Sequence, residues 1–263
     1  MQAQPAKEAT LQTARFRLCE HETARFGVRC ARADEVTLAD VAAIFRLTEE
    51  ARIDLLMLRC SARELDVVHY VERSGFRLMD TILYTGVDLS REPKTPELPG
   101  VQYRLATAND SARVGDLAAL AFRNYCSHYH ADPRLSKLDA DSVYREWAER
   151  SCVDTSVANR VVLAENAGEL LGFGAIRLTV PGEADGALFA VAPSAQGRGI
   201  FRSLLWQALT YSRQTGLERF TYSTQIQYLA ALRTISGMGF EIKGAAYIFH
   251  GWFDSDQSRA HLK

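Results

Sequence analysis

The chain has 263 residues and a hydrophobic content of 47 %, which fits one large folded domain or two of medium size. Its net charge of −1 gives no electrostatic reason to expect nucleic acid or an anionic membrane surface as a partner. No apolar run reaches the roughly 20 residues of a membrane-spanning helix, and residues 1–13 lack the apolar core of a secretory signal, so we expect a cytoplasmic protein.

The first ninety residues alternate between strand and helix patterns after a polar leader, residues 1–14. Apolar and polar residues alternate roughly over 26–32, which predicts a half-buried strand. Thr37 or Asp40 caps a predicted helix over 41–52, and Gly75 closes a second one. The expected elements are therefore a strand over 26–32, a helix over 41–52, a strand over 53–60, a helix over 63–73, and a long strand or hairpin arm over 76–89.

Residues 90–100 have the composition of a linker, with prolines at Pro93, Pro96 and Pro99. We therefore predict a domain boundary here, with a first domain over 1–98 and a second over 99–263.

The second domain begins with a predicted strand over 103–106. A helix over 111–125 follows, with Asn109 as its cap and with Val114, Leu117, Leu120 and Ala121 facing inward. Beyond it we expect an irregular loop over 126–138, a helix over 142–150 capped by Asp139 or Asp141, a hairpin of 160–166 and 169–178 around Ala167-Gly168, a strand over 218–224, a helix over 228–239 ended by Gly239, strands over 240–253, and a polar tail.

The stretch from Ala187 to Leu205 changes period in its middle. Residues 187–192 form a short apolar run typical of a buried strand, which Pro193 ends. From Ile200 the pattern is helical, with Ile200, Leu204, Leu205 and Ala208 on one stripe and Arg202 and Ser203 off it.

A strand, a glycine-containing turn and a helix in this order place unpaired N–H groups at a helix N-terminus, where the helix dipole favours an anion. Gly197 and Gly199 allow close approach of phosphate, and Arg198 adds positive charge. The Gly-Lys-Ser/Thr of nucleotide-triphosphate loops is absent, and Arg202 stands where the dinucleotide fingerprint requires a third Gly or Ala.

Residues Val191 to Phe201 resemble the acetyl-CoA signature of the GNAT superfamily of N-acetyltransferases, Val-x-Pro-x-x-Gln-x-x-Gly-x-Gly/Ala, with Phe201 in place of the small final residue. The resemblance implies an α/β (α+β) fold with a mixed central sheet flanked by helices, and acetyl-CoA or another acyl-CoA as co-substrate. It implies that a strand and turn hold the acyl-CoA, together with Gln225. The implied contacts are Phe189, Ala190, Val191, Gln196, Gly197, Arg198, Gly199, Ile200 and Phe201.

Short matches over most of the chain resemble the dTDP-fucosamine acetyltransferase group of sugar N-acetyltransferases, in which a truncated GNAT-like domain precedes the catalytic one. They lie at 24–28, 75–76, 87–89, 144–147, 171–173, 197–199, 224–225, 230–233 and 246–247. An internal similarity between 70–76 and 234–240 fits this plan. The resemblance implies direct transfer, in a ternary complex, of an acyl group to the amine of a nucleotide-linked amino sugar, such as a dTDP-4-amino-4,6-dideoxyhexose, in polysaccharide biosynthesis.

The proton donor to the leaving thiolate is left open by the sequence. In the family it is a tyrosine of the helix before Gly239-Phe240, and Ile235 stands at that place. Three explanations are open. Tyr228 supplies the hydroxyl from one to two turns earlier in the chain, the reaction runs on proximity alone without a proton donor, or the protein binds CoA as a sensor without catalysis. We take Tyr228 as the first hypothesis.

Two further groups are candidates for removing a proton from the amine. His128 and His130 lie in the loop that borders the acceptor in this family, as a general base, a diphosphate contact or merely solvated side chains; we select His130. Glu165 at a strand end is the other candidate, through an ordered water. Five scattered cysteines show no metal-ligand or redox spacing, so we expect no metal.

The rival functions are an acetyltransferase for another small amine or an antibiotic, and the non-catalytic CoA sensor. A homodimer through the apolar strand 247–249 is a further expectation.

Overall fold

A computed structural model of the chain describes residues 15–90 and 98–253. The predicted leader, most of the predicted linker and the polar tail lie outside these residues. The chain divides into two compact units, each described by itself below. The first unit comprises residues 1–82, 126–139 and 244–263, and the second comprises 83–125 and 140–243.

The first unit has strands in the order β1-β2-β3-β10. Its elements are β1 (Phe16–Leu18), α2 (Glu20–Phe26), β2 (Cys30–Ala33), α3 (Leu38–Glu50), β3 (Leu55–Ser61), α4 (Leu65–Arg73), the first half of β4 (Arg77–Asp88), α6 (His128–Ala131) and the greater part of β10 (Glu241–Trp252). Strands β2 and β3 are parallel, and residues 246–252 of β10 run antiparallel to β3.

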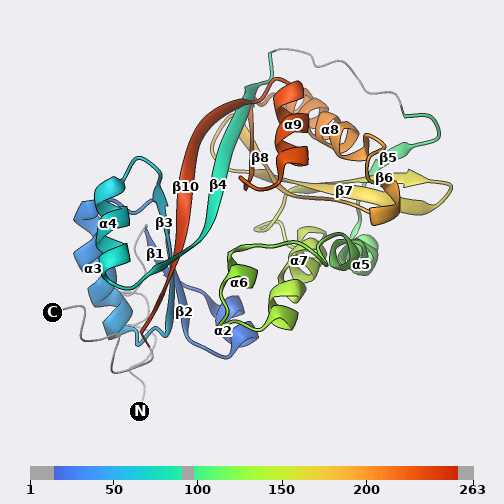
Figure 1. Cartoon of the computed structure of the whole chain (residues 1–263). Helices are drawn as coiled ribbons and strands as arrows, with labels where there is room; N and C mark the ends of the chain where they lie inside the picture. Colours follow the sequence, from blue (N-terminus) through green and yellow to red (C-terminus); the bar gives the residue numbers. More distant parts are fainter. Residues whose placement is uncertain (1–14, 91–97, 254–263) are drawn as a thin grey trace, which may run out of the picture. The chain divides into compact units, whose positions relative to one another are not determined.

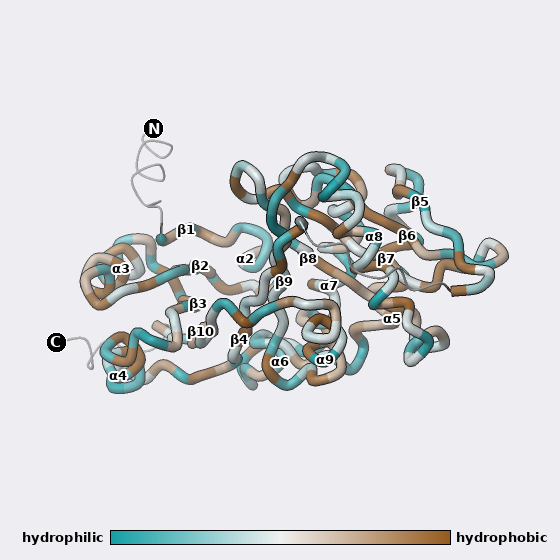
Figure 2. Tube along the Cα trace, turned by 90° about the horizontal axis from the view of Figure 1, so that it is seen from above, coloured by the Kyte–Doolittle hydropathy of each residue, from teal (hydrophilic) through white to brown (hydrophobic). Residues whose placement is uncertain are grey.

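Helices α3 and α4 pack on this sheet through one apolar face each. Val41, Ile44 and Phe45 of α3 and Val67 and Val71 of α4 are buried in one cluster with residues of β2 and β3. Figure 2 shows hydrophilic residues between the hydrophobic ones along both helices, as expected for helices with one solvent-facing side.

The second unit has strands in the order β4-β9-β8-β7-β6-β5. Its elements are the second half of β4, β5 (Gln102–Leu105), the 3₁₀ turn η1 (Ala108–Asp110), α5 (Ser111–Ala121), α7 (Lys137–Ser151), β6 (Arg160–Asn166), β7 (Glu169–Leu178), β8 (Glu183–Val191), the 3₁₀ turn η2 (Pro193–Ala195), α8 (Ile200–Gln214), β9 (Arg219–Gln225) and α9 (Leu229–Gly237). Helices α8 and α9 lie on one face of these strands, and α5 and α7 on the other (Figure 1).

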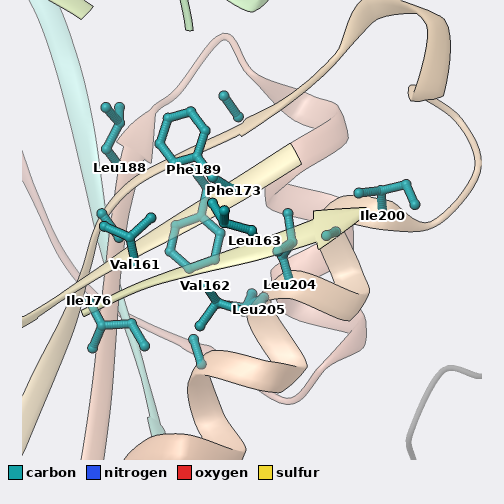
Figure 3. Packing of buried hydrophobic residues seen from close by; sticks show 14 of the residues in the cluster. Val161, Val162, Leu163, Phe173, Ile176, Leu188, Phe189, Ile200, Leu204 and Leu205 are labelled. Carbon is teal, nitrogen blue, oxygen red and sulfur yellow. The ribbon is translucent and has the colours of Figure 1, made fainter. Parts of the chain in front are cut away.

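Strands β6 and β7 are covered on both faces, which explains their continuous apolar runs. Side chains of β6, β7, β8 and α8 interdigitate in the largest buried cluster (Figure 3). The predicted hairpin is confirmed, because Ala167 and Gly168 both have positive φ, +48° and +85°, as a two-residue turn of type I′ requires.

Several local predictions are corrected by the structure. Ser203, which lies off the predicted apolar stripe, is nevertheless buried, and its hydroxyl accepts a hydrogen bond from Tyr103 at 2.6 Å and donates one to the Ile200 carbonyl at 3.0 Å. Leu120 is exposed. The N-cap of α5 is Asp110 and not Asn109, and a capping box lies at the preceding turn η1, where the Thr107 N–H donates to the Asp110 carboxylate at 2.8 Å.

Five element predictions also change. The predicted loop over 126–138 contains the helical turn α6, α7 begins before Asp139, and the predicted strand over 26–32 is shortened to β2 because α2 occupies Glu20–Phe26. In addition, β10 is one continuous strand. The strand β8 begins at Glu183, earlier than the apolar run alone predicts.

The internal similarity corresponds to a structural repeat. The order β2-α3-β3-α4-β4 recurs as β8-α8-β9-α9-β10, each time with a parallel strand pair joined by a helix. Helices α4 and α9 end alike: Gly75 and Gly239 have φ of +82° and +88°, and the amide of the following phenylalanine bonds the carbonyl of Val71 or Ile235.

The compact units differ from the predicted division at residue 98. Leu89 belongs to the second unit, where its N–H donates to the Glu218 carbonyl, although it precedes the linker. Residues 246–252 pair with β3 of the first unit, although they lie at the far end of the chain. Strand pairing therefore assigns β4 and β10 partly to each unit.

A cluster of charges connects β5, β6 and the turn before α5. Arg104 donates to both carboxylate oxygens of Asp110, at 2.9 and 2.7 Å, and to both of Glu165, at 2.9 and 3.0 Å. Arg113 bonds the same Glu165 carboxylate at 2.6 Å. Hydrogen bonds from Arg104 hold the pKa of Asp110 and of Glu165 below the usual range.

We expect Gly75→Ala and Gly239→Ala to lower the free energy of unfolding by similar amounts, about 1 kcal/mol each, because an L side chain is strained at these positive φ angles. An added Cβ meets no atom within 4 Å at either position, so sterics contribute little. Urea unfolding measures both. Gly237→Ala, also in open space but without positive φ, is the matched control and should not destabilise. Equal stability of all three variants would contradict the backbone argument.

We expect Arg104→Gln to lower the free energy of unfolding by about 1 kcal/mol at neutral pH. The effect is modest because the Arg104 side chain is 41 % exposed, so solvent screens its ion pairs. The lowered pKa values of Asp110 and Glu165 stabilise the folded state above the unfolded-state pKa and lose that effect as the pH falls below about 4.5. Without Arg104 the free energy of unfolding should therefore fall less steeply from pH 4.5 downward. Urea titrations at several pH values would show it, and parallel curves would contradict it.

Candidate acyl-CoA site

Strands β8 and β9 pair over only part of their length. Their parallel register runs from Glu183 to Gly186 on β8, opposite Arg219 to Tyr222 on β9. Both strands continue beyond it, to Val191 and Gln225. Beyond Gly186 on β8 and Tyr222 on β9, the two strands therefore no longer pair with each other.

The end of the pairing coincides with a bulge in β8. On its other side β8 pairs with β7, where Ile176 lies opposite Gly186 but Ala175 lies opposite Leu188, so Ala187 is an extra residue. A bulge bends the strand that carries it and increases the local twist. This bend accounts for the separation of β8 from β9 after Gly186.

The N-terminus of α8 follows directly after β8 and η2. Gly197 and Gly199 have φ of +74° and +82°, a conformation that side-chain-bearing residues rarely adopt. Gly199 is the N-cap and brings no side-chain hydrogen bond to the helix, whose first N–H groups lack acceptors within it. Residues 196–199 are exposed, and the Gln196 amide donates to the Val191 carbonyl at 3.4 Å.

The ring of Phe201 packs against the strands. It lies 6.0 Å from Phe189 and 5.9 Å from Tyr222, centroid to centroid. Phe189 in turn lies over Gly174, where a Cβ would come within 2.3 Å of its ring carbon. The large residue at the last signature position is thus accommodated by aromatic packing with β8 and β9.

The N-terminus of α3, the helix of the first repeat that corresponds to α8, is already capped. At α3, Thr37 and Asp40 form a capping box: the Thr37 N–H and hydroxyl both donate to the Asp40 carboxylate, at 2.9 and 2.6 Å. These hydrogen bonds hold the pKa of Asp40 below its usual range, so the helix end already carries a negative charge. Of the two repeats, only the second has an N-terminus suited to a phosphate.

Two tyrosines lie at the end of β9. The Tyr125 hydroxyl donates a hydrogen bond to the side-chain oxygen of the buried Gln225, and its ring stacks on Tyr228 with centroids 4.3 Å apart and planes 5° from parallel. Burial raises the pKa of Tyr125 and keeps it protonated. Tyr144 packs edge-on against Tyr125 at 4.9 Å. The half-buried Tyr228 is thereby held at the start of α9, where it is the N-cap.

Ile235 is buried in the core of the second unit, and no tyrosine lies within α9. A tyrosine hydroxyl on this helix itself is therefore absent, and Tyr228 immediately precedes the helix. Sequence reasoning missed Tyr125, because its contact with Gln225 joins residues a hundred positions apart.

Two predicted catalytic residues have other partners. Both oxygens of Glu165 bond arginine, as described above, which occupies the groups that would order a water. His130 completes a capping box at α6, where its Nδ1 accepts from the Ser127 N–H at 3.3 Å and lies 2.9 Å from the Ser127 hydroxyl. We carry neither into the proposed mechanism.

Among residues 15–90 and 98–253, no three His, Cys, Asp or Glu side chains are arranged so that they could hold a metal ion. In the same ranges, no helix has the length and apolar character to cross a bilayer.

Comparisons with known proteins agree with this geometry. Residues 122–240 match the model of the Acetyltransferase (GNAT) family. The spore coat polysaccharide biosynthesis protein SpsD of Bacillus subtilis (strain 168) is 24 % identical over 211 residues, covering 80 % of this chain and 71 % of SpsD.

Solved structures share the fold. The GCN5-related N-acetyltransferase from Sphaerobacter thermophilus superposes with a TM-score of 0.63 at 15 % identity, covering 90 % of this chain and 76 % of the other. A tandem GNAT protein from the clavulanic acid biosynthesis pathway gives 0.63 at 14 % identity, covering 88 % and 77 %. Residues 122–240 of the chain therefore match the GNAT acetyltransferase family, and the chain shares the fold of solved GNAT acetyltransferase structures.

Proposed function

We propose that the protein transfers the acetyl group of acetyl-CoA directly to the amine of a nucleotide-linked amino sugar, within a ternary complex. The observation that carries the donor half of this proposal is the open N-terminus of α8 at the point where β8 and β9 separate. The acceptor half is supported by the sequence resemblance and by the name of the relative SpsD.

The donor would be held mainly by main-chain groups. Amides from Gln196 to Phe201, with the positive end of the α8 dipole, suit the diphosphate of CoA. The exposed side chains of Arg198 and Arg202 add positive charge at the same helix end. The backbone of Phe189 to Val191, left without a parallel neighbour, suits the amides of the pantetheine arm, and Gln225 lies at the end of the opposite strand.

Tyr228 would donate the proton that the leaving thiolate requires. As the amine nitrogen attacks the thioester carbon, a C–N bond forms and the C–S bond breaks, and the sulfur takes up a proton. The Tyr228 hydroxyl is the proton donor of our first hypothesis, and stacking on Tyr125 fixes its ring. A positioned proton donor contributes about 10²–10⁴-fold.

An amino sugar is the acceptor that fits the two available indications. N-acyl transfer requires an amine, and the name of SpsD refers to polysaccharide biosynthesis. The nucleotide linkage follows from the resemblance to the dTDP-fucosamine acetyltransferase group. The cytoplasmic location and the homodimer stay predictions.

A turnover assay with an acceptor panel tests the reaction. We expect free thiol to be released from acetyl-CoA with dTDP- or UDP-linked amino sugars, and a product heavier by one acetyl group by mass spectrometry. Release only with simple amines or an aminoglycoside would contradict the amino-sugar acceptor. Tight CoA binding without thiol release from any acceptor would contradict catalysis and favour the sensor.

Tyr228→Phe should lower kcat by about 10²-fold or more while the KM for acetyl-CoA stays the same, since phenylalanine keeps the ring that stacks on Tyr125 and removes only the hydroxyl. Steady-state kinetics with the best acceptor of the panel measures it. An unchanged kcat would remove Tyr228 as the proton donor and leave proximity as the explanation.

A further inference from the structure

Tyr125 contacts two groups of the proposed site at once. Its hydroxyl donates a hydrogen bond to Oε1 of Gln225 at the end of β9, and its ring stacks on the ring of Tyr228 with centroids 4.3 Å apart. Gln225 is an expected contact of the acyl-CoA, and Tyr228 is the proposed proton donor. All three residues belong to the second unit, which also contains β8, β9 and α8.

Further contacts hold Tyr125 itself in place. Its N–H donates to the Phe122 carbonyl at the end of α5, at 2.9 Å. The rings of Phe122 and of Tyr144 on α7 both pack edge-on against it, with centroids 5.0 and 4.9 Å away, and these two rings stack on each other at 4.4 Å. Edge-on and offset-stacked aromatic pairs are favourable beyond the apolar area that they bury. The ring that reaches Tyr228 is therefore supported by two helices.

Tyr125 is poorly suited to giving up a proton. Burial is the main cause of its pKa lying far above the usual range, and the neighbouring tyrosines act in the same direction. The hydrogen bond to Gln225 opposes this effect only in part, and it already occupies the phenolic proton. An efficient proton donor has a pKa near the working pH. Tyr125 therefore keeps its proton, and any part that it takes in transfer is one of positioning.

The hydrogen bond also fixes the amide of Gln225. Because Oε1 accepts from the Tyr125 hydroxyl, the N–H₂ group of the amide is left to donate to another partner. The two ends of an amide have nearly the same shape, so without this bond the group could turn over. Gln225 lies beyond Tyr222, where β9 no longer pairs with β8, and it is 8 % exposed. The oriented amide therefore belongs to the part of β9 that has separated from β8.

We propose that Tyr125 is a positioning residue for acyl transfer, whose hydroxyl orients the Gln225 amide toward the acyl-CoA and whose ring orients Tyr228 toward the leaving thiolate. This rests on the proposed function. Tyr125 forms no bond and transfers no proton: the proton passes from the Tyr228 hydroxyl to sulfur as the C–S bond breaks. Binding of the acyl donor and proton transfer thus share one support, which the two edges of a single side chain provide.

Tyr125→Phe separates the two roles, because it keeps the ring and removes only the hydroxyl. We expect the KM for acetyl-CoA to rise about 3- to 10-fold, the effect of one lost hydrogen bond, while kcat stays within about twofold. Steady-state kinetics with the best acceptor measures both constants. An unchanged KM would overturn the role of the hydroxyl.

Tyr125→Leu removes the ring as well as the hydroxyl. We expect the same rise in the KM for acetyl-CoA and, in addition, a fall in kcat of about 10²-fold, because the Tyr228 hydroxyl is no longer held in place. A kcat equal to that of Tyr125→Phe would overturn the role of the ring. Circular dichroism checks that the variant folds, and Tyr125→Phe, which keeps the packing, tests the proposal if the leucine variant does not.

Double variants distinguish positioning from a general loss of structure. If Tyr125 acts on kcat only through Tyr228, then Tyr125→Leu should not lower kcat further in a Tyr228→Phe protein. If its hydroxyl acts on KM only through Gln225, then Tyr125→Phe should not raise KM further in a Gln225→Leu protein. Full additivity in both cycles would overturn the proposal.

Tyr103→Phe is the matched control. Tyr103 is another half-buried tyrosine of the second unit, and its hydroxyl donates to Ser203, one hundred residues along the chain, at 2.6 Å. We expect Tyr103→Phe to lower the urea midpoint about as much as Tyr125→Phe, with KM and kcat unchanged. Equal kinetic changes in the two variants would overturn the proposal, because loss of a long-range hydrogen bond would then account for both.

Nitrogen-15 NMR of the Gln225 side chain gives a readout that does not depend on turnover. Its N–H₂ signals, assigned by their absence in Gln225→Leu, should shift when acetyl-CoA is added, and should shift less in Tyr125→Phe at saturation. Signals of the unmodified protein that stay in place at saturation would overturn the proposal. Failure of the proposed function would look different, since the protein would then acetylate no acceptor although these signals respond to acetyl-CoA.

Discussion

One extra residue, Ala187 in β8, accounts for the separation of two strands that otherwise run side by side. Up to Gly186 the strands β8 and β9 share a parallel register, and after the bulge they do not. The backbone beyond it is left for a ligand, and the helix that follows begins with glycine at its cap. The proposed donor site therefore depends on main-chain geometry more than on any particular side chain.

The two repeats show how a small change in sequence opens or closes such a site. Both place a helix between parallel strands, and both end the next helix with a left-handed glycine, Gly75 or Gly239. They differ at the start of the first helix. At the N-terminus of α3 the Asp40 carboxylate completes the capping box, and its negative charge repels a further anion. At the N-terminus of α8 the N-cap Gly199 has no side chain, so it supplies neither a hydrogen-bond acceptor nor a charge. A front domain derived from the same repeat need not bind CoA.

The fold could be predicted from the sequence where the signal was local. The hairpin at Ala167-Gly168, the glycine ends of α4 and α9 and the strand–turn–helix around Gly199 each arise from residues adjacent in the chain. The buried position of Ser203 could not be foreseen, since it depends on Tyr103, one hundred residues away. Residue membership of the two units was equally hidden, because it depends on how β4 and β10 pair.

The candidate site shows the same limit. Apart from Gln225, the expected acyl-CoA contacts lie close together in the chain, and the resemblance of Val191 to Phe201 to a family signature implied them. The long-range contacts of buried polar groups could not be recognised in this way: Tyr125 bonds Gln225, and His128 reaches Asp132 through His250, more than a hundred residues along the chain. The sequence analysis selected His130 and Glu165 as candidate bases. In the structure His130 bonds the nearby Ser127, whereas Glu165 bonds Arg104, 61 residues away in the chain.

Amide chemical shifts measured by NMR during titration with CoA test the central claim most directly. If main-chain N–H groups at the start of α8 bind the diphosphate, the amides of Gly197, Gly199 and Ile200 should shift strongly with CoA. They should stay in place with pantetheine, which lacks the diphosphate. Saturation with CoA that leaves these amides unmoved while others shift would contradict the account.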